Sequence, residues 1–283
     1  MSVSRVGAAR RALPTVSVAP EVDARRGRPT GGVTRWARQV VALSRVEITL
    51  FVREPFAMFF SLAFPLVLLL FVGSVGARTE VVTGVRFIDT YMASMVGMTA
   101  ANVGIMGLAI HVAENRSRGA LKRYRLSPLH PSAFFTAQWI TAALTLAVSL
   151  VGLTVVTFSL YGPTDATRWG AFLAVGVLAL YVAVSWGMLL GGLPLPLRSV
   201  QVISAAVFFL MFFSSGAALP RQAFPQWLQS ITDWNPLAQL NDLLVHFYSG
   251  AYDANWLSIG VLIVTSLVIN LITIKTFNWE GQS

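Results

Sequence analysis

Six separate apolar stretches divide this chain, and each is about as long as a helix needs to cross a bilayer, which takes about 20 residues. None contains Asp, Glu, Lys or Arg; they cover residues 56–76, 90–110, 132–160, 170–193, 200–219 and 256–274. Only 12% of all residues are charged, against about 25% in soluble domains. The sequence therefore predicts an all-α polytopic membrane protein with six transmembrane helices.

The basic residues orient these spans. An even number of spans puts both termini on one side, and 17 of the 21 Lys and Arg fall in the segments of that side. The acidic residues divide equally, so the bias is that of the positive-inside rule, and both termini are expected in the cytoplasm. The excess of Arg over Lys, 19 to 2, points to a bacterial source, and hence to the plasma (inner) membrane.

Two regions precede the first span. Residues 1–32 are rich in Arg, Pro, Ser and Gly and are expected to form a disordered cytoplasmic tail, with the membrane domain over 33–283. The next segment predicts an amphipathic helix lying in the cytoplasmic interface, or a solvated helix that anchors the first span. Its apolar face carries Trp36, Val40, Leu43 and Leu50, and its basic face carries Arg35, Arg38, Arg45 and Arg53.

The longest outer segment, residues 220–255, shows two helical patterns separated by Pro236. Trp227, Ile231 and Trp234 mark the first pattern, and Gly250 is a stop signal after the second. Two short outer helices are therefore expected before the last span.

Several kinds of chemistry are missing from the sequence. The chain has two lysines, neither preceded by glycine, so it carries no phosphate-binding P-loop, and it has no cysteine. No metal-ligand or nucleic-acid-reading motif is present, and we expect no catalytic, cofactor or metal site. Two alternatives stay open: an ion-coupled transporter or channel, and a membrane enzyme acting on lipid through Asp233, Asp242, His246 or Asp253.

A basic insert, residues 111–131, separates the second and third spans. Arg118, Lys122 and Arg125 share one face of a short helix, and Ser127 with Pro128 should end it. A solvated loop whose positive charge keeps this segment in the cytoplasm would explain the arginines. Such a loop would not need a glycine at 119, which a sharp turn before a short helix does use.

The insert resembles the cytoplasmic loop of ABC-2 type export permeases, a family that includes the permease subunits of daunorubicin-type drug exporters. The resemblance covers about residues 33–278. It rests on the order of Glu114, Arg116, Arg118-Gly119, Leu121-Lys122-Arg123 and Ser127-Pro128-Leu129, on Arg53-Glu54-Pro55 before the first span, and on residues 212–228.

The resemblance implies that the insert, over residues 113–127, is a coupling helix that docks on a separate ATP-binding subunit. Two permease chains, identical or different, and two such subunits would form an exporter of hydrophobic or amphipathic molecules: a drug, a lipid or a lipid-linked compound. ATP and Mg would be bound by the partner, with no cofactor in this chain. The implied docking residues are Glu114, Arg116, Arg118, Gly119, Leu121, Lys122, Arg123 and Tyr124, with the helix of Trp36, Arg38, Arg45 and Arg53 packed nearby.

The resemblance also places the substrate pathway at the interface of two permease chains, between the second and fifth spans. Methionine and phenylalanine side chains suit a large, apolar and variable substrate, although plain helix packing explains them as well. The candidate pathway residues are Met95, Thr99, Asn102 and Met106 in the second span, and Phe208, Phe209, Phe212 and Phe213 in the fifth. A neighbouring surface of small residues, including Gly97 and Gly104, is expected to pack closely on another helix.

Overall fold

The computed structural model describes residues 32–76, 80–82, 84–117, 131–164, 167–218, 224–251 and 255–276. This described part is almost entirely helical, and six of its helices are long and apolar enough to cross a membrane. Its one sheet is an antiparallel hairpin of β1 (Glu80–Val82) and β2 (Val85–Arg86), which the sequence did not predict. The expected class, an all-α polytopic membrane protein with six spans, is confirmed.

Two helical segments precede the body of the first span. Helix α1 (Gly32–Arg53) stops at Glu54, and α2 (Pro55–Met58) begins at once, because proline suits the first turn of a helix but not its interior. The π-helical segment η1 (Phe59–Ala63) and α3 (Phe64–Gly76) complete the span. The break at Glu54 separates α1 from the membrane-crossing helix.

The second span is longer than expected. Helix α4 (Phe87–Ala101), the π-helical segment η2 (Asn102–Leu108) and α5 (Ala109–Ser117) form one continuous helix of 31 residues. The sequence predicted only residues 90–110, because charged residues flank that stretch. Those charges are paired inside the protein: Asp89 bonds Arg86, with Oδ2 and Nε 2.8 Å apart. A charge that is paired does not have to end a helix in a membrane.

The other four spans agree with the prediction to within a few residues. Helix α9 starts three residues before the expected position and ends five residues before it, next to Gly216, which has a φ of 86°. The four helices are α7 (Pro131–Tyr161), α8 (Trp169–Gly192), α9 (Leu197–Ser214) and α12 (Trp256–Thr276).

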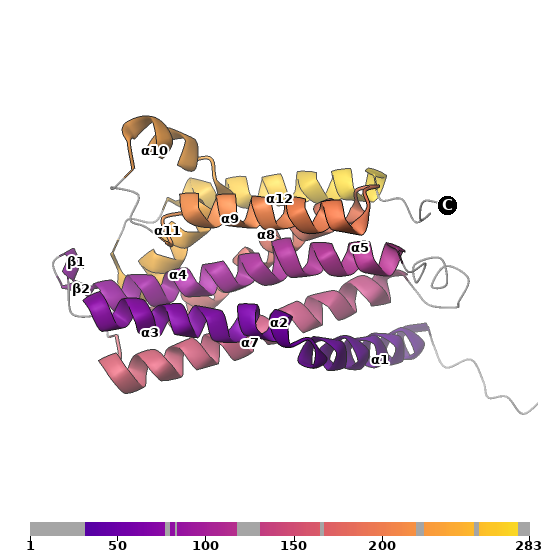
Figure 1. The fold of residues 1–283 in the computed structure, drawn as a ribbon, viewed down its shortest axis with the longest axis horizontal. Helices are drawn as coiled ribbons and strands as arrows, with labels where there is room; N and C mark the ends of the chain where they lie inside the picture. The colour runs from indigo at the N-terminus through magenta and orange to yellow at the C-terminus, as the bar shows by residue number, and fades with distance from the viewer. Residues whose placement is uncertain are drawn as a thin grey trace, which may run out of the picture.

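Figure 1 shows these helices side by side in an elongated bundle. We call the end where α5 stops and α7 starts the 118–130 end, and the opposite end, with β1 and β2, the hairpin end. Helix α1 begins and α12 finishes at the 118–130 end, as an even number of crossings requires (Figure 1).

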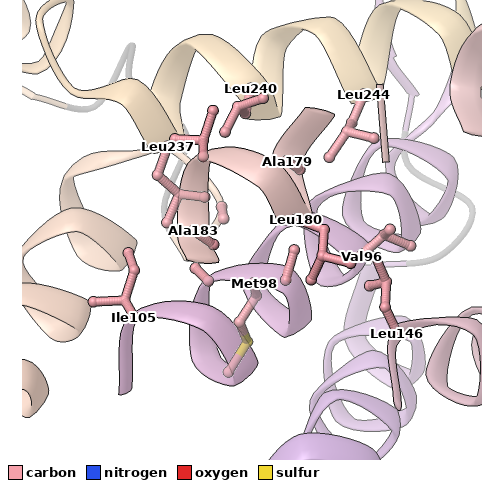
Figure 2. Packing of buried hydrophobic residues seen from close by; sticks show 14 of the residues in the cluster. Val96, Met98, Ile105, Leu146, Ala179, Leu180, Ala183, Leu237, Leu240 and Leu244 are labelled. Carbon is pink, nitrogen blue, oxygen red and sulfur yellow. The ribbon is translucent and has the colours of Figure 1, made fainter. Parts of the chain in front are cut away.

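The two short helices expected before the last span are α10 (Gln226–Thr232) and α11 (Pro236–Ser249). The side chain of Asn235 accepts a hydrogen bond of 2.9 Å from the Leu237 N–H and caps α11, and Gly250, at φ 73°, ends it. In Figure 2, Leu237, Leu240 and Leu244 of α11 lie in one cluster with residues of α4 and α8. Helix α11 therefore inserts into the bundle rather than lying on its surface.

The second and fourth spans form the centre of the bundle. In their most apolar windows 78% and 61% of the residues are buried, against 17–28% for the other four spans. Gly104 of η2 faces Gly187 of α8, and a Cβ added at Gly104 would lie 2.5 Å from the Cβ of Ala183. The expected close packing of small residues is therefore present at Gly104, where it brings the two central spans into backbone contact.

Candidate functional site

Most of the coupling helix implied by the sequence lies outside the described residues. This applies to Arg118, Gly119, Leu121, Lys122, Arg123 and Tyr124. Glu114 and Arg116, the two earlier members of the implied docking set, are described and lie in α5, which contains the first part of the insert, up to Ser117. The insert therefore begins within the helix that forms the second span.

Arg116 points into its own chain. It is 7% exposed, and its guanidinium donates hydrogen bonds to the carbonyl oxygens of Leu193 and Leu195. Leu193 caps the C-terminus of α8, whose last carbonyls attract a cation, and Leu195 lies in the link to α9. We therefore assign Arg116 a positioning role between α5 and the α8–α9 link, instead of the surface docking contact that the resemblance implies.

Helix α1 packs along the first turns of α7. The Trp36 indole N–H donates a 3.0 Å hydrogen bond to the Ser132 hydroxyl, and Val40 is buried. The face that carries Trp36 and Val40 thus contacts protein, although the sequence placed it in lipid. All four basic residues of this helix are exposed, as expected for its basic face: Arg35, Arg38, Arg45 and Arg53.

A buried polar cluster joins α1 to the second and third spans. The two carboxylate oxygens of Glu47 lie 2.9 Å from Gln138 Nε2 and 2.9 Å from His111 Nε2, and Asn115 also contacts His111. Glu47 and Gln138 are 8% and 5% exposed. Sequence reasoning missed this cluster because its members come from three helices. The sequence offered one signal for it: Glu47 is the single acidic residue of a helix whose other charged residues are arginines.

The polar cluster forms part of the wall of a cavity of about 350 Å³ between α1, η1, the η2–α5 segment and α7. Its polar lining comes from Glu47, Glu54, Ser61, Asn102, His111, Glu114, Gln138, Thr141 and Thr145. Its apolar lining includes Leu50, Phe51, Phe60, Val103, Met106 and Leu108. The described residues contain no group of three or more His, Cys, Asp or Glu side chains able to hold a metal ion.

The candidate pathway residues of the second span separate into two pairs. Met95 and Thr99 are completely buried, and the Thr99 hydroxyl lies 3.2 Å from that of Ser149 on α7. Asn102 and Met106 line the cavity instead. Met95 and Thr99 therefore pack within the bundle, while Asn102 and Met106 could contact a small molecule that occupies the cavity. A role of either pair in transport stays a prediction.

The four phenylalanines of α9 divide between its two faces. Phe208 and Phe212 are 2% and 5% exposed and stack on each other with ring centroids 6.0 Å apart. Phe209 and Phe213 are 45% and 54% exposed and also stack, at 6.2 Å. The outward pair is the one available for a second chain, for lipid or for a substrate, since the inward pair belongs to the core.

This division predicts opposite results for two neighbouring alanine variants. Phe208→Ala should destabilise the protein by about 3 kcal/mol, because it leaves a cavity in a packed core. Phe209→Ala removes an exposed ring and should leave the melting temperature of the purified protein within a few degrees of the wild-type value. Equal melting temperatures for the two variants would contradict the assignment of faces.

Comparisons with known proteins agree with this architecture. The family model for the ABC-2 type transporter matches residues 38–248, which include five of the six spans and the cavity. A protein of Bacillus subtilis (strain 168) named as a transport permease, YvfS, is 25% identical over 193 residues, covering 65% of this chain and 74% of its own. The match of the family model over most of the chain shows that this protein belongs to the ABC-2 type transporter family.

Proposed function

We propose that this chain is the permease subunit of an ATP-driven exporter. It would move a hydrophobic or amphipathic molecule, such as a drug, a lipid or a lipid-linked compound, out of the cytoplasm or the inner leaflet. Membership of the ABC-2 family supports a transport role. The sequence has no P-loop of its own, so active transport needs an ATP-binding partner.

The observation that carries the proposal is the connection of the insert to three spans. The helix of the second span includes the first residues of the insert, up to Ser117, and Arg116 connects this part to the α8–α9 link. Force applied to the insert by a partner would therefore reach the second span along its axis and the fourth and fifth spans through Arg116. This arrangement suits a permease whose conformational change is driven by a separate ATP-binding subunit.

The assembly we propose has two permease chains, identical or different, and two ATP-binding subunits that hold ATP and Mg. The insert, over residues 113–127, would dock on the ATP-binding subunit, with α1 beside it. We place the complex in a bacterial plasma membrane with both termini in the cytoplasm, because Lys and Arg concentrate in the segments of the 118–130 end.

The test is purification of the tagged permease from its native membrane, followed by co-expression with the ATP-binding subunit that it retains. Wild-type permease should co-purify with that subunit and export substrate in an ATP-dependent manner in inside-out vesicles. The double variant Gly119→Asp with Leu121→Asp should lower ATP-dependent transport more than about tenfold, since two buried carboxylates would disrupt the docking contact.

A matched control adds the same two charges at the opposite end of the molecule. Gln226→Asp with Ser230→Asp changes two exposed residues of α10 and should leave transport unchanged. Wild-type transport in the Gly119 and Leu121 double variant would exclude the docking role. Transport that survives ATP depletion, without any bound ATP-binding subunit, would refute the proposed function in favour of an ion-coupled transporter or channel.

A further inference from the structure

We propose that the cavity between α1, η1, the η2–α5 segment and α7 binds an amphipathic cation, with the charged group at Glu47 and the apolar part against Phe60 and Met106. This site lies within one chain, unlike the pathway expected between two permease chains. The inference that an exported substrate carries a positive charge rests on the proposed function. Binding of a cation to the cavity requires neither ATP nor a partner.

The charge of the lining is the first argument. Three carboxylates line the cavity, from Glu47, Glu54 and Glu114, and they outnumber its single imidazole, His111, while neither Lys nor Arg is among the lining residues. The chain as a whole carries a net charge of +9. Glu47 is the buried member of the three, whereas Glu114 is half-buried and Glu54 is exposed. The charge of Glu47 therefore gives the main preference for a cation over an anion, because a buried charge interacts strongly in a medium of low dielectric constant.

The hydrogen-bonding capacity of a buried amide is the second argument. Gln138 is 5% exposed and donates to Glu47, but its amide oxygen accepts no hydrogen bond from the described residues. Buried amides normally have their polar atoms paired, so this oxygen, which is an acceptor, is available to a bound cation.

The apolar part of the lining limits what that molecule can be. Phe51, Phe60 and Met106 offer aromatic faces and a flexible thioether, which attract cations and adapt to irregular apolar shapes. A cavity of about 350 Å³ lies within the usual range for small-molecule sites. A simple inorganic cation would leave this apolar surface without contacts, whereas an amphipathic organic cation uses both parts of the lining.

The backbone around the cavity is also unusual. The π-helical segments η1 and η2 both contribute to the lining, and the Ser61 hydroxyl joins them through a 3.1 Å hydrogen bond to the Asn102 amide oxygen. A π-helical turn widens the helix locally and is frequent at functional sites. Two such segments meeting at one cavity therefore support its assignment as a binding site.

The test uses the full chain in nanodiscs of phosphatidylcholine, without ATP or a partner, and radiolabelled tetraphenylphosphonium as the probe. Binding should saturate, and dodecylamine, charged at neutral pH, should displace the probe, whereas its uncharged counterpart dodecanol should not. Glu47→Gln should weaken probe binding at least about tenfold, since it removes a carboxylate but keeps the size and the hydrogen bond to Gln138.

Two further variants separate binding from folding. Met106→Trp fills the cavity and should abolish binding without removing any charge. Glu80→Gln removes a carboxylate from the hairpin end and should bind the probe like the wild type. Wild-type affinity in Met106→Trp, or equal displacement by dodecanol and dodecylamine, would overturn the inference. If the probe binds but no ATP-binding subunit associates, only the proposed function fails; ATP-dependent export without saturable cation binding would refute only the site.

Discussion

Gly187→Ala should prevent accumulation of a stable protein, although it adds a single methyl group. A Cβ at Gly187 would collide with the carbonyl oxygen of Gly104, in the contact between the two most buried spans. A rotamer change cannot relieve this collision, because a Cβ and a backbone carbonyl oxygen are both fixed by the backbone. We therefore expect a loss of at least about 3 kcal/mol, the upper part of the usual range for overpacking. The readout is the melting temperature and the monodisperse yield in detergent.

The matched control lies on the same helix. A Cβ at Gly176 would have no other atom within 4 Å, so Gly176→Ala makes the same chemical change in open space. It should melt at the wild-type temperature or slightly above it, because alanine is a better helix former than glycine. If Gly187→Ala and Gly176→Ala were equally stable, the close contact between the second and fourth spans would be refuted.

Arg116→Met should have the second largest effect. The substitution keeps an unbranched side chain but removes the guanidinium that donates to the carbonyl oxygens of Leu193 and Leu195; the Leu193 carbonyl keeps the Leu195 N–H as a donor. A hydrogen bond to a charged group contributes about 1.5–3 kcal/mol, so the loss of two should destabilise the protein by about 3 kcal/mol. We also expect ATP hydrolysis by the assembled complex to lose its stimulation by substrate, since the link from α5 to α9 would be broken.

Arg168→Met is the control for this variant, because Arg168 is exposed at the start of α8 and belongs to none of the proposed contacts with the ATP-binding subunit. It removes the same charge and should change neither the melting temperature nor the stimulation. Arg116→Lys should lie between the two, since a lysine offers a charge without the planar fork that reaches two carbonyls. An Arg116→Met protein with wild-type melting temperature and wild-type stimulation would show that the contact positions nothing.

The sequence predicted the secondary structure well and the ends of the helices less well. Long apolar stretches must become helices in a bilayer, because only a helix satisfies its own backbone there. The second span exceeded its prediction because its terminal charged residues are paired in the fold. Asp89 pairs with Arg86, three residues earlier, and with Thr164. Arg116 donates to the Leu193 carbonyl. The π-helical segments were not predicted either, since residue types alone do not distinguish an i+5 hydrogen bond from an i+4 one.

The candidate site shows the same limit. Family resemblance placed Arg116 on a docking surface, whereas the fold turns it inward. The candidate pathway set contained both Phe208 and Phe209, although adjacent residues on a helix point about 100° apart and one is buried while the other is exposed. The resemblance directed attention to the insert and the interface between chains, and not to Glu47, whose partners lie on two other spans.

By itself, the sequence determined that this chain has six segments able to cross a membrane, that its basic segments alternate with them so as to share one side, and that it contains no P-loop motif. These properties depend on local composition, because the insertion of each segment is set by its own hydrophobicity and by the charges that flank it. Only the tertiary structure decided that Glu47, His111 and Gln138 meet, that Arg116 ties α5 to the α8–α9 link, and that Gly104 faces Gly187. Such contacts depend on how helices pack against one another, and packing is a property of pairs of surfaces that no single segment contains.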